Sequence, residues 1–313
     1  MFHPFHHAKA NPDKVAIVMA GSGETTTYRQ LDERSNQGAQ LFRSLGLKRG
    51  DSIALFLENH PRYFEICWAA QRAGLYYTCI SSALTAGEVE YIVRDCGAKL
   101  FITSKAKAGE AEKLAPKISD LKLFSVDGGW GPYAGFEDAR ARMPATPIAD
   151  EAPGVDMLYS SGTTGRPKGV RVELKDEPID AINSLVQLAA GLFGFNKDTV
   201  YLSPAPLYHA APLRYNMAVH RLGDPDRRRV AEILGPAESR DHHEVGRVEE
   251  RAVPRMGRDS RFDLTRLEIV VLRGRIDTGD AMVDGLTWFR YVNASLDSAA
   301  ADAAATLGMN GRG

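Results

Sequence analysis

Short apolar segments recur along the first half of the chain, separated by longer amphipathic ones. Runs rich in β-branched and aromatic residues between turn-forming residues are typical of buried strands. We expect such strands at residues 14–19, 52–57, 76–80, 100–103 and 123–126.

The segments between these strands carry apolar residues at the three- to four-residue spacing of a helix. We expect helices that begin at Thr27, near residue 63, at Thr85 and near residue 111. Thr27 stands three residues before Gln30, which is the spacing of a capping box. Glycines that follow the first three helices are expected to end them: Gly46, Gly74 and Gly97.

Strands that alternate with helices predict βαβ units and a largely parallel sheet. We therefore expect an α/β fold in which helices flank largely parallel sheets. Residues 127–153 are rich in glycine, proline and alanine, and we expect a loop or linker there.

The composition changes at about residue 222. Residues 1–222 hold 12 lysines and 13 arginines, whereas residues 223–313 hold 14 arginines and no lysine. Only four aromatic residues lie in this later segment, which leaves few large side chains for a core. Two interpretations stay open for it: an arginine-rich subdomain, or a degenerate, out-of-frame continuation of a longer ancestral protein. We favour a domain at 1–222 followed by a degenerate tail.

Charge and cysteine content exclude several classes of function. The net charge of −1 provides no overall basic field, so we expect no nucleic-acid partner. The three cysteines are too few for a disulfide scaffold and fit a reducing cytoplasm. No apolar run reaches the roughly 20 residues of a transmembrane helix, and the N-terminus does not resemble a secretory signal. We expect a cytoplasmic protein.

Residues 157–170 read Met-Leu-Tyr-Ser-Ser-Gly-Thr-Thr-Gly-Arg-Pro-Lys-Gly-Val and form the sharpest motif. Its glycines let successive backbone N–H groups surround an anion. Hydroxyl side chains add donors for phosphate oxygens or ligands for Mg²⁺, and Lys168 adds a positive charge. Lys168 follows a proline and precedes a glycine, so this is not a Walker A loop. The alternative is an ordinary surface turn.

In this order the residues resemble the phosphate-binding signature of the AMP-forming adenylating enzymes, which include acyl-CoA synthetases, peptide-synthetase adenylation domains and luciferases. Further segments resemble the family in the family's own order, from His7 to Ala16 through to residues 202–212. The resemblance covers about 1–222. It is strongest for bacterial fatty acyl-CoA synthetases, because of Glu58-Asn-His-Pro61 and the proline-flanked Tyr208-His209.

This resemblance implies the N-terminal piece of the adenylate-forming fold and a two-step ligation. A fatty-acid carboxylate would attack ATP-Mg²⁺ to give an acyl adenylate, and coenzyme A would then displace AMP. Thr163, Lys168 and His209 would be catalytic, with Thr163 at the metal and His209 lining the acyl pocket. The residues implied to bind the nucleotide are Ser160, Ser161, Gly162, Thr163, Thr164, Gly165 and Lys168.

The histidines also admit structural interpretations. His209 lies between prolines and is equally consistent, by its chemistry alone, with a packed loop residue. His3, His6 and His7 could bind a metal, but we expect them to lie on a fraying terminus.

Several elements that the resemblance implies are missing. No lysine follows Lys197, and no Tyr-x-x-Ser/Thr-Glu segment follows residue 222. A ribose-type Thr-Gly-Asp occurs at 278–280, but too early for the family, and we interpret it as coincidence. We expect a truncated, impaired ligase without the small C-terminal domain. The alternatives are a non-catalytic nucleotide- or polyphosphate-binding module and a remnant without function.

Overall fold

The computed structural model describes residues 2–160, 166–196, 199 and 201–223. Beyond them it describes the backbone of three short strands: β12 (Ala231–Ile233), β13 (Arg275–Asp277) and β14 (Met282–Asp284). Strands β13 and β14 pair with each other in antiparallel fashion.

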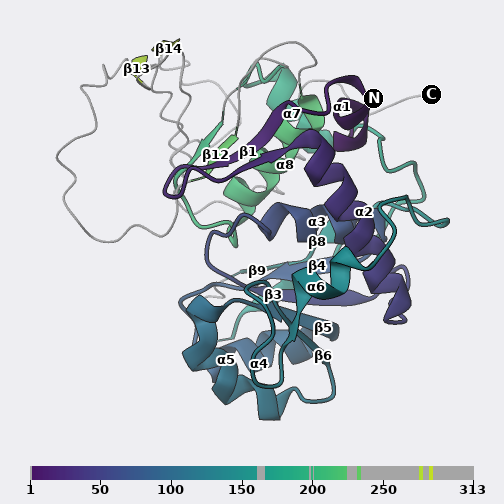
Figure 1. Cartoon of the computed structure of the whole chain (residues 1–313), viewed down its shortest axis with the longest axis vertical. Coiled ribbons are helices and arrows are strands. Elements are labelled where there is room, and N and C mark those ends of the chain that lie inside the picture. Colours follow the sequence, from purple (N-terminus) through teal and green to yellow (C-terminus); the bar gives the residue numbers. More distant parts are fainter. Residues whose placement is uncertain are drawn as a thin grey trace, which may run out of the picture.

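A six-stranded sheet forms the centre of the described fold (Figure 1). Every neighbouring pair of its strands is parallel, which confirms the expected parallel sheet. The strand order is β7 (Ala134–Gly135), β6 (Lys122–Ser125), β5 (Ala98–Thr103), β3 (Ser52–Phe56), β4 (Tyr76–Cys79) and β8 (Val155–Asp156). All residues of β3 are buried, as expected for a parallel strand covered on both faces.

Helices cover both faces of this sheet, and each face has its own cluster of buried apolar residues. In Figure 1, α4 (Ala86–Asp95) and α5 (Ala108–Leu114) lie below the sheet. Above it lie α2 (Tyr28–Ser44) and α3 (Tyr63–Arg72). Helix α6 (Phe136–Ala141) belongs to the same side, because its Phe136 lies in one apolar cluster with residues of α2 and α3. Two short 3₁₀ turns, 105–107 and 115–117, flank α5.

A second, smaller sheet has the order β11 (Leu202–Ser203), β12, β1 (Val15–Met19) and β2 (Thr25–Thr27). Strands β11, β12 and β1 are parallel, whereas β2 returns from β1 in antiparallel fashion. The remaining helices are α1 (Pro4–Ala10), α7 (Ser184–Gly191) and α8 (Ala210–Leu222). Apolar residues of α7 and α8 form a third cluster together with Phe195 and Tyr201.

The predicted helix signals are confirmed. Thr27 accepts a hydrogen bond from the Gln30 N–H, and the Gln30 side chain accepts one from the Thr27 N–H. These two bonds are the capping box, which satisfies N–H groups that the first turn of α2 leaves unpaired. Gly46, Gly74 and Gly97 have φ of 86°, 63° and 65°, the left-handed conformation in which glycine commonly ends helices.

Two expectations about irregular segments are wrong. Residues 127–153 contain β7 and α6, because Phe136 is buried in the core and anchors a short helix among the glycines and prolines. The N-terminus does not fray either. His3 caps α1 by accepting the Phe5 N–H at 3.2 Å, and its ring lies 5.0 Å from that of Trp68. Tertiary packing thus orders both segments.

Candidate functional site

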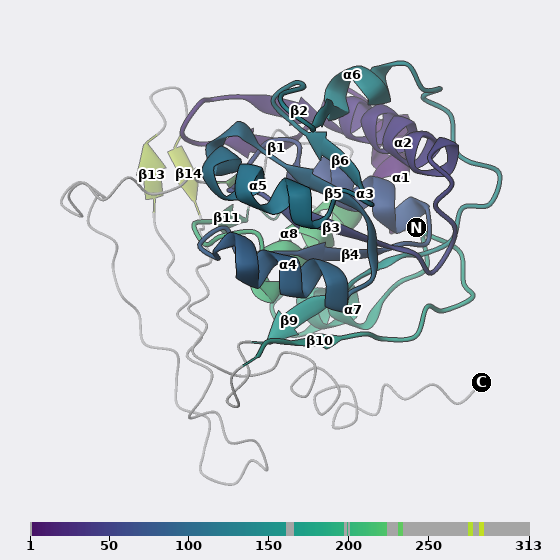
Figure 2. The same ribbon diagram turned by 90° about the horizontal axis from the view of Figure 1, so that it is seen from below.

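The 157–170 motif forms a hairpin. Its strands are β9 (Leu158–Ser160) and β10 (Lys168–Val170), which pair in antiparallel register with Lys168 opposite Ser160 (Figure 2). Residues 161–165, which hold most of the expected phosphate ligands, lie outside the described residues. The structure therefore shows the stem of the loop, with an exposed Lys168 at its exit.

Hydrogen bonds from two elements hold this stem in place. Helix α4 contributes Tyr91, whose hydroxyl donates to the Pro167 carbonyl at 3.2 Å. It also contributes Asp95, which accepts from the Tyr159 hydroxyl. Burial and this bond to a carboxylate raise the pKa of Tyr159, so its hydroxyl stays protonated. The Tyr76 hydroxyl of β4 donates to the Val172 carbonyl at 2.7 Å.

Gly169 allows the hairpin to close over Tyr159. A Cβ at position 169 would lie 2.6 Å from the Met157 methyl group and 2.8 Å from the Tyr159 ring carbon Cζ. Both distances are shorter than real Cβ contacts, and Tyr159 is itself held by Asp95. Lys168 thus provides an exposed positive charge, and Gly169 lets the backbone approach the Tyr159 ring closely.

His209 lies directly before α8, at the N-cap position, and its side chain makes no capping hydrogen bond. The residue is exposed, with its ring 4.5 Å from that of Tyr208. Neighbouring protein atoms nevertheless shield the ring from part of the water and lower the pKa of His209, which favours a neutral imidazole at pH 7. A neutral imidazole can accept a proton or a hydrogen bond.

An ion pair to a buried carboxylate connects the two motifs. Arg214 lies one turn into α8, after His209, and Asp156 ends β8 just before the hairpin. The guanidinium Nη2 and Nε lie 2.9 and 3.0 Å from the same carboxylate oxygen of Asp156. Asp156 is 7% exposed, so little water competes with this pair. The helix that begins after His209 is therefore fixed to the strand that leads into the motif.

The sequence-predicted site residues divide into three groups. Lys168 and His209 are described: Lys168 begins β10, and His209 directly precedes α8, whose Arg214 binds Asp156 of β8. Only the main chain of Ser160 is described, as the last residue of β9. Ser161, Gly162, Thr163, Thr164 and Gly165 lie outside the described residues, so their nucleotide and metal roles stay predictions.

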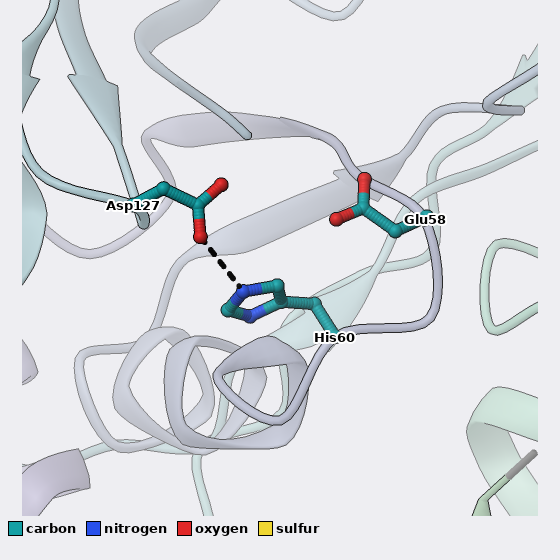
Figure 3. Close-up of side chains that lie close together, drawn as sticks. All are labelled: Glu58, His60 and Asp127. Carbon is teal, nitrogen blue, oxygen red and sulfur yellow. Dashed lines mark hydrogen bonds and ion pairs between the residues drawn. The ribbon is translucent and has the colours of Figure 1, made fainter. Parts of the chain in front are cut away.

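A further cluster lies at the carboxyl ends of the central strands, where Glu58, His60 and Asp127 approach one another (Figure 3). Their ligand atoms all lie within 4.8 Å of each other, close enough for a metal ion. Both His60 nitrogens are already engaged, however. Nδ1 accepts the Arg62 N–H at 3.1 Å, and Nε2 lies 3.3 Å from Asp127 Oδ1.

Because Nδ1 is an acceptor, neutral His60 carries its proton on Nε2 and donates it to Asp127. A metal on Nε2 would force a proton onto Nδ1, facing the Arg62 N–H. Glu58 in turn accepts from the Ser104 hydroxyl, and Asp127 from the Lys105 N–H at 2.7 Å. Through these hydrogen bonds, Glu58, His60 and Asp127 connect the ends of β3, β5 and β6, and we call this network the lock.

Sequence reasoning missed the residues that hold the motifs, namely Tyr76, Tyr91, Asp156 and Arg214. Asp156 and Arg214 are 58 positions apart in the sequence, and Tyr76 and Val172 are 96 apart. Local patterns carry no information about such pairs. The one local signal is that Asp156 is a charged residue between two apolar ones, Val155 and Met157.

Comparisons with known proteins give the family. The "AMP-binding enzyme" family model matches residues 4–223. Long-chain fatty acid transport protein 1 of Mus musculus is 32% identical over 177 residues, 53% of this chain and 27% of that protein. The fatty acid–acyl-carrier-protein ligase ScoC of Streptomyces coeruleorubidus is 32% identical over 168 residues, 52% of this chain and 31% of that protein. The chain thus spans about a third of these relatives' length.

Solved structures share the fold. A fatty acyl CoA synthetase of Mycobacterium tuberculosis superposes with a TM-score of 0.57 at 24% identity, over 74% of this chain and 44% of that one. ATP-bound MatB of Rhodopseudomonas palustris gives 0.56 at 24% identity, over 74% and 45%. Among the described helices, none is long and apolar enough to cross a membrane. By the extent of the family match, which includes both motifs, the chain belongs to the AMP-binding enzyme family.

Proposed function

We propose that this chain is the N-terminal part of an AMP-forming ligase that activates a fatty acid with ATP and transfers it to coenzyme A. The names of the relatives support the substrate class, since they include a long-chain fatty acid transport protein and a fatty acid ligase. A second ligase, feruloyl-CoA synthase of Amycolatopsis, is 28% identical over 214 residues and supports a thiol acceptor.

The observation that carries this proposal is the ion pair between Asp156 and Arg214. It couples the strand that leads into the phosphate hairpin to the helix that begins after His209. A ligase that moves an acyl group from phosphate to thiol needs its anion-binding and acyl-binding elements in one fixed arrangement, because such chemistry depends on positioning.

Each site residue then has a distinct role. Backbone and hydroxyl groups of 160–165 surround the ATP phosphates, and Lys168 offsets their negative charge. Thr163 is the proposed ligand of Mg²⁺, which would neutralise phosphate charge during attack by the carboxylate. His209, neutral at pH 7, lines the acyl pocket near the entering thiol.

The 313-residue chain by itself should ligate poorly. It has no lysine after Lys197 and no Tyr-x-x-Ser/Thr-Glu segment after residue 222, the proposed domain boundary. Loss of one preorganised polar contact costs about 10²–10³ in rate, and two such groups are missing. Wild-type protein with ATP-Mg²⁺, coenzyme A and fatty acids should form acyl-CoA at close to the background rate.

The assay separates the candidate functions when wild type and Lys168→Ala are compared. Robust turnover that Lys168→Ala abolishes would support the ligase and contradict the impairment. Without turnover, a rise in Tm with ATP-Mg²⁺ would indicate a nucleotide-binding module, because a ligand that binds only the folded state stabilises it. If there is neither turnover nor a rise in Tm, both the ligase and the nucleotide-binding module are contradicted, and a remnant without function is left.

A further inference from the structure

Asn59 lies in the connection between β3 and α3, at the carboxyl end of the central sheet. Along the chain, β3 is followed by β4 on one side of it and then by β5 on its other side. The connection from β3 to β4 and the connection from β5 to β6 therefore run in opposite directions across the sheet, so the strand order reverses between β3 and β5. In open parallel sheets, such a reversal marks the place where ligands bind.

The side chain of Asn59 reaches from this position to the loop that carries His209. Its Oδ1 accepts the Leu207 N–H at 2.8 Å, and its Nδ2 donates to the Ala205 carbonyl at 3.3 Å. One amide thus holds both polar groups of a short backbone segment, as a neighbouring strand would. The two contacts join positions 146 and 148 residues apart in sequence.

The loop needs such a partner because of its own sequence. It runs from β11 to His209 as Pro204-Ala-Pro-Leu-Tyr. Prolines 204 and 206 have no N–H and cannot support a regular strand ladder. An amide is suited to the task, since it presents one donor and one acceptor together. Leu207 itself is fully buried, so the loop is fixed at that point by packing and by Asn59.

Asn59 is held in turn by its neighbours. Glu58 accepts from Ser104 at the end of β5, and His60 donates to Asp127 beyond β6. The lock described above therefore fixes the chain on both sides of Asn59. A side chain on a fixed backbone loses little entropy when it binds, which makes it an effective clamp.

We propose that Asn59 is a positioning residue, which sets the place of His209 by clamping the backbone of residues 205–207. This inference rests on the proposed function for the role of His209, but the clamp itself does not depend on catalysis. The lock of Glu58, His60 and Asp127 supports the clamp from the side of the central sheet.

Hydrogen exchange of the full chain tests the clamp directly. In Asn59→Ala, amide exchange in the peptide that spans 204–209 should accelerate on the order of tenfold, since two hydrogen bonds are lost. Asn59→Asp retains an acceptor for Leu207 and should show a smaller increase. Thr85→Ala removes the cap of α4 and is the matched control: it should lower Tm without accelerating this peptide.

Unchanged exchange at 204–209 in Asn59→Ala, at a Tm like that of the control, would overturn the clamp. Equal acceleration in Thr85→Ala would also overturn it, because the effect would then follow overall stability.

The link to the reaction has its own readout. If wild type turns over, Asn59→Ala should lower kcat for acyl-CoA formation by about tenfold and leave the KM for ATP unchanged. A raised KM for ATP with normal kcat would contradict the assigned role. Wild type that neither turns over nor rises in Tm with ATP-Mg²⁺ would count against the proposed function, and the exchange result would still decide the clamp.

Discussion

His220 illustrates how one residue type takes on unlike properties within this chain. It has no exposed surface, and its Nδ1 accepts a hydrogen bond from the Trp68 indole at 3.3 Å. Burial lowers its pKa to about 3. The pKa of His209, a residue with an exposed surface, is lowered by partial desolvation. His3 and His7, also buried, have lowered pKa values for the same main reason. These three histidines are structural.

Because His220 is buried in its neutral form, the free energy of unfolding depends on pH. Its folded pKa is below the value of about 6.5 for an unfolded chain, so the unfolded state takes up the proton first. Stability is thus fully present above pH 6.5 and falls as the pH drops toward 3. In urea unfolding, His220→Gln should lose about 2 kcal/mol less between pH 7 and pH 5 than wild type. Equal losses would contradict a neutral, buried His220.

At the residue scale, the sequence predicts a group of functional residues only where its members are neighbours along the chain. Lys168 and the hydroxyl residues around it stand within one continuous motif, so their grouping needs no knowledge of the fold. Asn59 and Asp156 could not be identified in this way, because their partners come from distant elements. His3 was misjudged for the same reason: its burial depends on Trp68.

At the element scale, the hairpin of β9 and β10 is held by tyrosine hydroxyls from its neighbours. Tyr76 and Tyr91 donate to the carbonyls of Val172 and Pro167, on either side of β10. The Arg171 guanidinium also lies 4.1 Å from the centre of the Tyr76 ring, at cation–π distance. These contacts fix the strand that begins with Lys168.

Removing both hydroxyls should therefore weaken nucleotide binding. We expect the double variant Tyr76→Phe, Tyr91→Phe to raise the Kd for ATP-Mg²⁺ several-fold, because each hydrogen bond contributes about 0.5–1.5 kcal/mol. Tyr133→Phe is the matched control, since its hydroxyl donates to the Ala111 carbonyl, away from the hairpin. Titration calorimetry measures the three proteins. Equal affinities in all of them would show that the hairpin needs no such support.

Elements with explicit start and stop signals were the best predicted. The capping box at Thr27 and the glycines after the helices mark their ends because these signals act within one turn. Helix α6 was missed because its six residues follow a glycine-rich stretch and gain their order from Phe136 in the core. Local composition does not report such packing.

At the scale of the whole molecule, two polar contacts join the central sheet to the segments on either side of His209. Asn59 joins the end of β3 to the loop after β11, and Arg214 joins α8 to β8. These two contacts, at Leu207 and at Arg214, lie on either side of His209 in the sequence. The parallel architecture was predictable from the alternation of strands and helices. The meeting of the two sheets was not, since it depends on contacts between distant segments.

The central claim is that the 157–170 motif binds the phosphates of ATP through Lys168. Calorimetric titration of wild type and Lys168→Ala with ATP, pyrophosphate and AMP tests it most directly. We predict that ATP and pyrophosphate bind wild type with similar affinity, that AMP binds poorly, and that Lys168→Ala weakens the first two by about tenfold or more, the effect of one charge-assisted contact. Tight AMP binding that is unaffected by Lys168→Ala would contradict the account.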